Sequence, residues 1–352
     1  MGDCDYLNAR VRAMGADLLG REFFEQVLSL TTEDLPLDAL LASPYGPVLR
    51  DSLSREQGIR AVEHALRAEL VRAFSRVRAM APEGPRALID VQLARWDLQN
   101  IIAVMRAVTR GAERGEIAAS LLPAGAFPES LLTELASLPD ALSVARALAT
   151  WNYPFAFELH HALVVRRGFS PELPRAEQAL YRAYYRWALD SSMPASEDQR
   201  ILRKLVRLQI DLANIKAVLD LVRHRSAGEE PQPLDPIPGG RLPKRFLPNL
   251  AASPSLEAAF EALDRTFFAP GIEMGILAYG ASRSLGVMER YLEEQVILAG
   301  CSLYRDRNPL SIAVPLGYLW RKYNETVNLR ALYRGWHSRM PANAIRKELL
   351  LV

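Results

Sequence analysis

An internal repeat is the feature that most restricts what this chain can fold into. Three segments share one pattern, in which an acidic residue is followed three positions later by an asparagine. The pairs are Asp97 with Asn100, Asp211 with Asn214, and Glu325 with Asn328, and the acids are spaced by 114 residues in both intervals (97 to 211 and 211 to 325). Three such copies would fill almost all of the 352 positions. We therefore predict pseudo-threefold symmetry, with helical repeats at 1–117, 118–231 and 232–352.

The repeat extends beyond these pairs. The turn sequence Leu122-Pro123-Ala124-Gly125 returns 115 residues later (122 to 237) as Ile237-Pro238-Gly239-Gly240. Prolines keep the same offset, as Pro128 and Pro243 do. Agreement of several features in one register is far more specific than one shared tetrapeptide.

The composition favours helix throughout. Ala, Leu, Arg and Glu dominate, and all four are good helix formers. Apolar residues recur every three or four positions from 86 to 110, and Gly111 is the expected stop. The same periodicity predicts helices at 54–80, 171–190, 197–225 and 287–304. We expect an all-α fold, because no convincing strand-and-hairpin pattern is present, and a Pro- and Gly-rich loop at 225–241.

The recurring acid and asparagine lie on one helix face. Both residue types bond the local backbone readily and are therefore mediocre inside a helix. Their recurrence predicts a structural role, in which Asp97, Asn100 and their counterparts cap or bracket a neighbouring chain segment with buried hydrogen bonds. The functional alternative is a set of carboxylates that act on a ligand. We favour the structural role, because no nucleophile or base accompanies them at a repeatable spacing.

Charge and motifs argue against nucleic-acid, nucleotide and metal binding. The chain has 43 Lys plus Arg against 41 Asp plus Glu, without the concentrated basic excess of a nucleic-acid-binding domain. It contains no Gly-x-x-x-x-Gly-Lys-Ser/Thr phosphate loop. His160 and His161 point about 100° apart on a helix and do not form the i, i+4 pair of a helical zinc site. We therefore predict no catalytic residue, no cofactor and no metal ligand.

Cysteine content and hydropathy bear on where the chain works. Cys4 and Cys301 are too few for a disulfide scaffold and fit a reducing compartment. The most apolar run, 312–320, is about half of the ~20 residues of a spanning helix, and it contains Pro315 and Gly317. We expect no direct membrane insertion, so any work at a membrane would require a partner that holds the chain there.

Three stretches allow a second interpretation. The sequence Tyr181-Arg182-Ala183-Tyr184-Tyr185-Arg186-Trp187 could stack on bases, but an amphipathic bundle helix gives the same pattern, and we favour the helix. Arg166-Arg167 before Gly168 could be a basic patch, although such residues are ordinary at a helix C-terminus. Gly271, Gly275 and Gly280 follow no strand, so we do not expect them to bind phosphate.

The two ends of the chain resemble a known family. The opening residues are Tyr6-Leu7-Asn8-Ala9-Arg10-Val11-Arg12-Ala13-Met14, and the closing ones are Asn308-Pro309-Leu310, Tyr318, Arg321-Lys322, Glu325 and Asn328-Leu329-Arg330. The middle matches through Arg95, Asp97, Asn100 and Arg106. Together they are similar to the C subunit of the archaeal and bacterial V/A-type ATPases, whose eukaryotic vacuolar counterpart is the d subunit. The stretch 226–235 looks like a local elaboration.

The resemblance implies a funnel of three similar helical lobes around a pseudo-threefold axis, without catalysis of its own. It implies a rotor socket between the central-stalk subunits (D/F type) and the membrane proteolipid ring, which transmits torque for proton or sodium transport. A further expected partner is the cytoplasmic part of the large membrane stator subunit. The expected location is the cytoplasmic face of the membrane, where partner subunits hold the chain.

Two other classes of function remain open at this point. The first is a stand-alone all-helical scaffold that binds some other protein, and the second is a helical hydrolase or transferase with a dispersed active site. Genes for a proteolipid, nucleotide-binding subunits and a stalk beside this one would favour the rotor. An isolated gene would favour the scaffold, and turnover by the purified chain would favour the enzyme.

Overall fold

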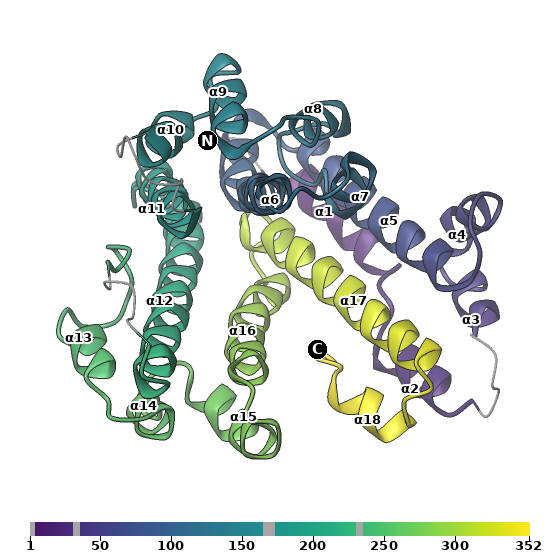
Figure 1. The fold of residues 1–352 in the computed structure, drawn as a ribbon. Coiled ribbons are helices and arrows are strands. Elements are labelled where there is room, and N and C mark those ends of the chain that lie inside the picture. The colour runs from purple at the N-terminus through teal and green to yellow at the C-terminus, as the bar shows by residue number, and fades with distance from the viewer. Residues whose placement is uncertain (1–3, 31–35, 165–172, 230–234) are drawn as a thin grey trace. The chain divides into compact units, whose positions relative to one another are not determined.

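The computed structural model describes residues 4–30, 36–164, 173–229 and 235–352, and every regular element within these ranges is a helix (Figure 1). The expectation of an all-α fold is confirmed. Arg166-Arg167-Gly168 lie outside the described residues.

The chain divides into two compact units. The first combines Met1–Leu138 with Gly300–Val352, and the second is Pro139–Ala299. The first unit contains α1 (Asp5–Gly15), α2 (Arg21–Leu28), α3 (Leu37–Leu41), α4 (Gly46–Leu53), α5 (Gly58–Met80), α6 (Glu83–Thr109), α7 (Arg114–Ser120), α8 (Glu129–Leu135), the 3₁₀ helix η1 (Leu303–Arg305), α17 (Ala313–His337) and α18 (Ala342–Lys347). The second contains α9 (Ala141–Thr150), α10 (Ala156–Val164), α11 (Leu173–Ser191), α12 (Glu197–Ser226), α13 (Phe246–Ala251), α14 (Leu256–Leu263), α15 (Ala269–Ser282) and most of α16 (Leu285–Ser302).

Helix lengths recur along the chain. In each of the series α2–α6, α8–α12 and α13–α17, three shorter helices precede two longer ones. The last helices of the series, α6, α12 and α17, have 27, 30 and 25 residues, and each carries one acid–asparagine pair. This succession agrees with an internal repeat in the sequence. The repeat boundaries and the three-lobed funnel stay predictions.

Local chemistry explains several helix ends. Ser196 and Ser255 cap α12 and α14, because each side chain accepts an N–H from the first turn of its helix. Gly111, the predicted stop of α6, follows the last turn with a φ of 70°, which glycine adopts without strain. The helix expected at 54–80 begins later, at Gly58, whose φ of 58° breaks the preceding turn.

The core of the first unit joins segments from both ends of the sequence. Helix α17 packs along α5, and its Leu329, Leu332 and Tyr333 are buried in one cluster with Phe24 and Tyr45. Burial of an aliphatic or aromatic side chain contributes about 1.5–3 kcal/mol each. The two ends of the sequence therefore stabilise each other in one core.

Aromatic residues fill part of the second unit. Tyr184 and Tyr185 of α11 are buried, and Phe155 lies edge-on to Tyr184 and Trp187. Tyr184 and Tyr185 thus face the protein interior, as the bundle-helix interpretation requires.

The glycine series lies in α15. An added Cβ at Gly271 would lie 2.6 Å from the Tyr291 carbonyl oxygen, so this glycine allows α15 to approach α16 closely.

None of the described helices is both long enough and apolar enough to cross a membrane. Within the same ranges, no three His, Cys, Asp or Glu side chains are grouped as metal ligands would be.

Candidate functional site

The three acid–asparagine pairs lie in the interior of the described structure. Asp97 and Asn100 are in α6, Asp211 and Asn214 in α12, and Glu325 and Asn328 in α17. All six side chains are between 1% and 5% exposed. A buried polar group is costly unless it is hydrogen-bonded, so the partners of these residues decide what they do.

Each asparagine pairs with both backbone groups of one residue in a following turn. Asn100 donates from Nδ2 to the Leu122 carbonyl at 2.7 Å and accepts the Leu122 N–H at 2.9 Å. Asn214 makes the same two bonds to Ile237, at 2.9 and 2.8 Å. Asn328 makes them to Leu350, at 2.8 and 2.9 Å. The side-chain amide thus makes the two hydrogen bonds that a neighbouring strand would make. It satisfies the N–H and C=O of a residue that lies outside the helices.

The first two acids bind the next part of the same turn. Asp97 accepts the N–H groups of Ala126 and Phe127 at 2.7 and 3.1 Å. Asp211 accepts those of Arg241 at 2.8 Å and Leu242 at 3.2 Å. Each turn is therefore held at two points by one helix. We call the set of backbone bonds made by the acid and the asparagine of one helix a bracket.

A glycine precedes the bonded N–H groups in both of these brackets. An added Cβ at Gly125 would lie 2.5 Å from Asp97 Oδ2, and one at Gly240 would lie 3.2 Å from Asp211 Cγ and closer still to Oδ1. A side chain in either place would displace the carboxylate. The glycines of the repeated Pro-x-Gly turn are thus required by the close approach of the backbone to the acid.

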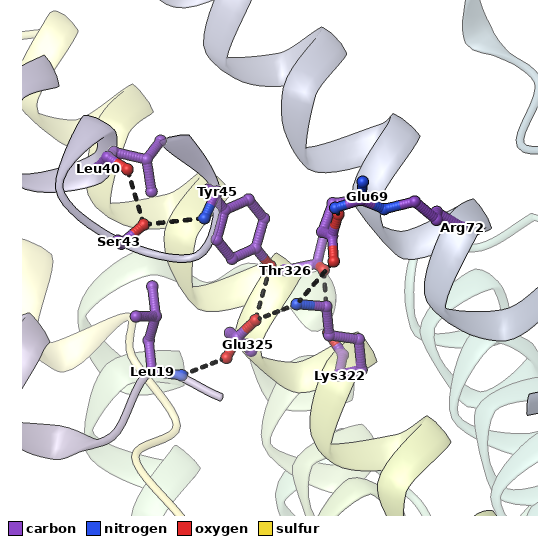
Figure 2. Close-up of polar contacts among 9 residues, drawn as sticks. All are labelled: Leu19, Leu40, Ser43, Tyr45, Glu69, Arg72, Lys322, Glu325 and Thr326. Carbon is purple, nitrogen blue, oxygen red and sulfur yellow. Dashed lines mark hydrogen bonds and ion pairs between the residues drawn. The ribbon is translucent and has the colours of Figure 1, made fainter. Parts of the chain in front are cut away.

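The third acid binds groups from distant parts of the first unit (Figure 2). Glu325 accepts the Leu19 N–H at 2.5 Å through Oε2 and the Tyr45 hydroxyl at 2.6 Å through Oε1. Lys322, three residues earlier in α17, donates to the same Oε1 at 2.8 Å. Its ammonium also lies 3.8 Å from Glu69 Oε1 and 4.4 Å from the centre of the Tyr45 ring. Four separate segments therefore meet at one ion pair.

The position of Leu19 matches the other two brackets. Leu19 lies just ahead of α2, as Phe127 lies just ahead of α8 and Leu242 ahead of α13. In the first two copies the acid binds a segment about thirty residues further along the chain, whereas Glu325 binds a segment 306 positions earlier. The third bracket thus uses the beginning of the first series of helices.

Burial raises the pKa of several of these groups. Desolvation raises the pKa of Asp97 from 3.8 to about 6, although the two backbone N–H bonds act in the opposite direction. Desolvation also raises the pKa of Asp211. Burial, and then the Glu325 carboxylate, raise the pKa of Tyr45 well above its ordinary value, so its hydroxyl stays protonated and can donate.

Two cavities adjoin the brackets. One, of about 130 Å³, is lined by Arg78, Arg86 and Gly125 among others, and the second, of about 190 Å³, by Arg321, Glu325 and Asn328 among others. Arg78 is paired with Asp90 at 2.5 Å, and Arg86 donates to the Ala81 carbonyl at 3.0 Å. The carboxylates beside these cavities already bond N–H or O–H groups of the chain. The arrangement is suited to holding turns in place and not to transferring protons to a ligand.

Sequence reasoning missed the partners of Glu325. Lys322, Glu69 and Tyr45 were not singled out as a cluster, although Lys322 precedes Glu325 by three positions and so shares its helix face. The use of Glu in place of Asp in the third copy was the available signal, because a longer side chain reaches more distant partners.

The bracket gives a direct stability prediction. Replacing Asn214 by Leu should lower the free energy of unfolding by about 1–3 kcal/mol, because the buried N–H and carbonyl of Ile237 lose both partners. Chemical denaturation of the purified chain measures this loss. Asn249→Leu, at an exposed position of α13, is the matched control, with an expected change within about 0.5 kcal/mol. Equal effects of the two variants would contradict the bracket.

The raised pKa of Asp97 predicts a pH effect. Between about pH 4 and pH 6 the unfolded chain releases this proton while the folded chain keeps it, so the contribution of Asp97 to stability is largest below pH 4 and is lost as the pH rises. The full loss is about 3 kcal/mol, at 1.36 kcal/mol for each pKa unit. An amide does not titrate, so Asp97→Asn should improve relative to the wild type by up to this amount between pH 4 and pH 7. Denaturation curves at several pH values test this, and a difference that does not vary with pH would contradict it.

The sequence is similar to known proteins along nearly its whole length. The sequence model of the family described as "ATP synthase (C/AC39) subunit" matches residues 7–348. The C subunit of the A-type ATP synthase of Methanocaldococcus jannaschii is 24% identical over 98% of this chain and 86% of that protein. The A-type C subunit of Methanosarcina mazei is 27% identical over 99% and 92%. The C subunit of the V-type ATP synthase of Deinococcus radiodurans is 25% identical over 99% and 91%.

Proposed function

Because the chain belongs to the ATP synthase (C/AC39) subunit family, we propose that it is a non-catalytic central-rotor subunit of a V/A-type rotary ATPase or ATP synthase. In this role it is a socket that links the central stalk to the membrane proteolipid ring. It transmits torque between ATP chemistry and the transport of protons or sodium ions.

The observation that carries this proposal is the extent of the family match. It covers residues 7–348, and the matched relatives are named as C subunits of A-type and V-type ATP synthases. A match of this length includes the long helices of both units and all three acid–asparagine pairs. It favours a role that uses the whole chain over a role confined to one site.

The brackets support a load-transmitting role. A subunit that passes torque must resist twisting, and the turns between its helices are its most compliant parts. In this chain, buried side chains of α6, α12 and α17 hold turns at two or more points, with hydrogen bonds of 2.5–3.2 Å. Fully satisfied buried polar networks restrict the conformations that a core can adopt.

A socket of this kind works with particular partners and at a particular location. The partners are the central-stalk subunits (D/F type), the proteolipid ring and the cytoplasmic part of the large membrane stator subunit. Nucleic acid is not among them. The chain works at the cytoplasmic face of the membrane as a peripheral subunit, without inserting into the bilayer. Three helical repeats, at 1–117, 118–231 and 232–352, give broad support to the ring while one central site accepts the stalk.

Removal of the chain tests the proposal. In reconstituted complexes without it, we expect ATP hydrolysis by the soluble head to continue while ion pumping is lost, because hydrolysis no longer turns the ring. The measurement is proton or sodium pumping beside the ATPase rate, with and without the chain. Adding the purified chain back is the control and should restore pumping. Undiminished pumping in its absence would overturn the rotor assignment.

A further inference from the structure

Arg95 of α6 is surrounded by aromatic rings from two helices of the first unit. Its guanidinium carbon lies 4.7 Å from the ring centre of Trp320, 5.2 Å from that of Trp96 and 5.9 Å from that of Tyr323. Trp96 and Trp320 are themselves buried. Stacking of a guanidinium on aromatic faces fixes its plane and leaves its N–H groups pointing outward in that plane.

This guanidinium has no acceptor within the part of the chain that the structure describes. Its only interactions there are with the three rings. Two other arginines of the same unit differ, because Arg78 is paired with Asp90 and Arg334 with Glu63. Arg95 is only partly buried, so its guanidinium can be reached from outside the chain. A charged donor group that is stacked on rings in a partly apolar setting and has no acceptor there points to an acceptor from outside.

We propose that Arg95, held by Trp96, Trp320 and Tyr323, is a docking point for the carboxylate of an aspartate or glutamate on a partner subunit. The inference rests on the proposed function, which requires contacts with other subunits. A guanidinium with a fixed plane presents a fork of donors that matches a carboxylate in a bidentate pair. Because the rings already hold the fork in place, little conformational entropy is lost when the carboxylate binds.

A protein side chain fits this position better than a small free anion. Arg95 is half-buried, and it lines neither of the two cavities described above. A carboxylate that projects from an apposed surface can reach it without an enclosed pocket. The rings around the pair exclude water and so strengthen the attraction.

Substitution by lysine turns this docking point into a chemical probe. The chain has no lysine before Lys204, and the lysine next to Tyr323, Lys322, is 3% exposed and paired with Glu325, so Arg95→Lys places a new accessible primary amine at this position. The assembled complex carrying Arg95→Lys is treated with a water-soluble carbodiimide, which joins an amine to a contacting carboxylate as an amide with loss of water. We expect one dominant cross-link, to an Asp or Glu of another subunit, identified by mass spectrometry. Arg110→Lys, exposed just beyond the end of the same helix, is the control and should give no such product.

A second variant measures the strength of the contact. Arg95→Gln should weaken the hold of the complex on this chain by roughly tenfold or more, seen as release at lower salt, because the carboxylate loses its charged partner. The isolated Arg95→Gln chain also loses the stacking on the three rings, so its unfolding is measured separately. Release of a chain that is still folded under the same conditions separates docking from folding. A cross-link within the chain, a product no stronger than that of the control, or unchanged release would each overturn the inference. If removal of the chain still abolishes pumping in that case, the proposed function stands without this docking point.

Discussion

Lys322→Met is expected to lower the free energy of unfolding by about 3–5 kcal/mol, the range for loss of one partner from a buried ion pair. Lys322 is 3% exposed and is the cation that faces both Glu325 and Glu69. Methionine fills a similar volume, but it leaves the Glu325 carboxylate uncompensated beside Tyr45. Chemical denaturation of the purified chain at neutral pH measures the change.

Two further variants make this test specific. Lys216 also bonds two glutamates, Glu289 and Glu293, but its side chain is 31% exposed, so Lys216→Met should cost less than about 1 kcal/mol. The double variant Lys322→Met with Glu325→Gln should be more stable than Lys322→Met alone, because the unpaired charge is removed. A small loss in Lys322→Met, or no recovery in the double variant, would show that the cluster is not a buried ion pair in solution.

Gly317→Ala is expected to cost about 3 kcal/mol or more, the upper part of the range for overpacking a core. Gly317 lies in α17 where this helix meets η1, and an added Cβ would lie 2.6 Å from Tyr304 Cα and 2.7 Å from the Leu303 carbonyl carbon. These are backbone atoms, so no rotation of a side chain can relieve the contact. The two segments would have to move apart.

Gly280→Ala is the matched control. Gly280 also lies inside a helix, α15, but nothing is within 4 Å of its missing Cβ. Alanine there should raise stability by about 0.5–1 kcal/mol, because it removes the flexibility of glycine from a helix interior. Thermal unfolding of both variants compares them directly. Similar behaviour of the two glycines would mean that α17 and η1 are not in close contact.

Patterns that repeat along one chain were sufficient to predict the helical class and the character of the six motif residues. Asp97 and Asn100 share a face because they are three positions apart, and their recurrence without an accompanying nucleophile or base favoured a structural role. The turn at Leu122 was visible as well, since it returns at Ile237 in the same register. Local spacing and self-similarity are properties of a single sequence, so these features could be predicted from it.

Contacts between distant segments could not be predicted in this way. Glu325 meets Leu19 and Tyr45 across 306 and 280 positions, and no periodicity links those parts of the chain. Gly317 was noticed only as an interruption of an apolar run, whereas its role depends on the approach of η1. The rings around Arg95 come from α6 and α17, which lie more than two hundred positions apart. These features follow from tertiary packing, which one sequence without relatives does not specify.

The third bracket also closes a circuit of contacts within the first unit. Within one turn of α17, Glu325 binds the segment ahead of α2 and Asn328 binds Leu350, so the sequence of contacts returns to its starting point although the polypeptide is linear. The first and last parts of the chain are therefore held by the same helix although they are far apart in sequence. A truncation that removes residues 1–20 would break the circuit at Glu325, 306 positions from Leu19, because Glu325 Oε2 would lose the Leu19 N–H.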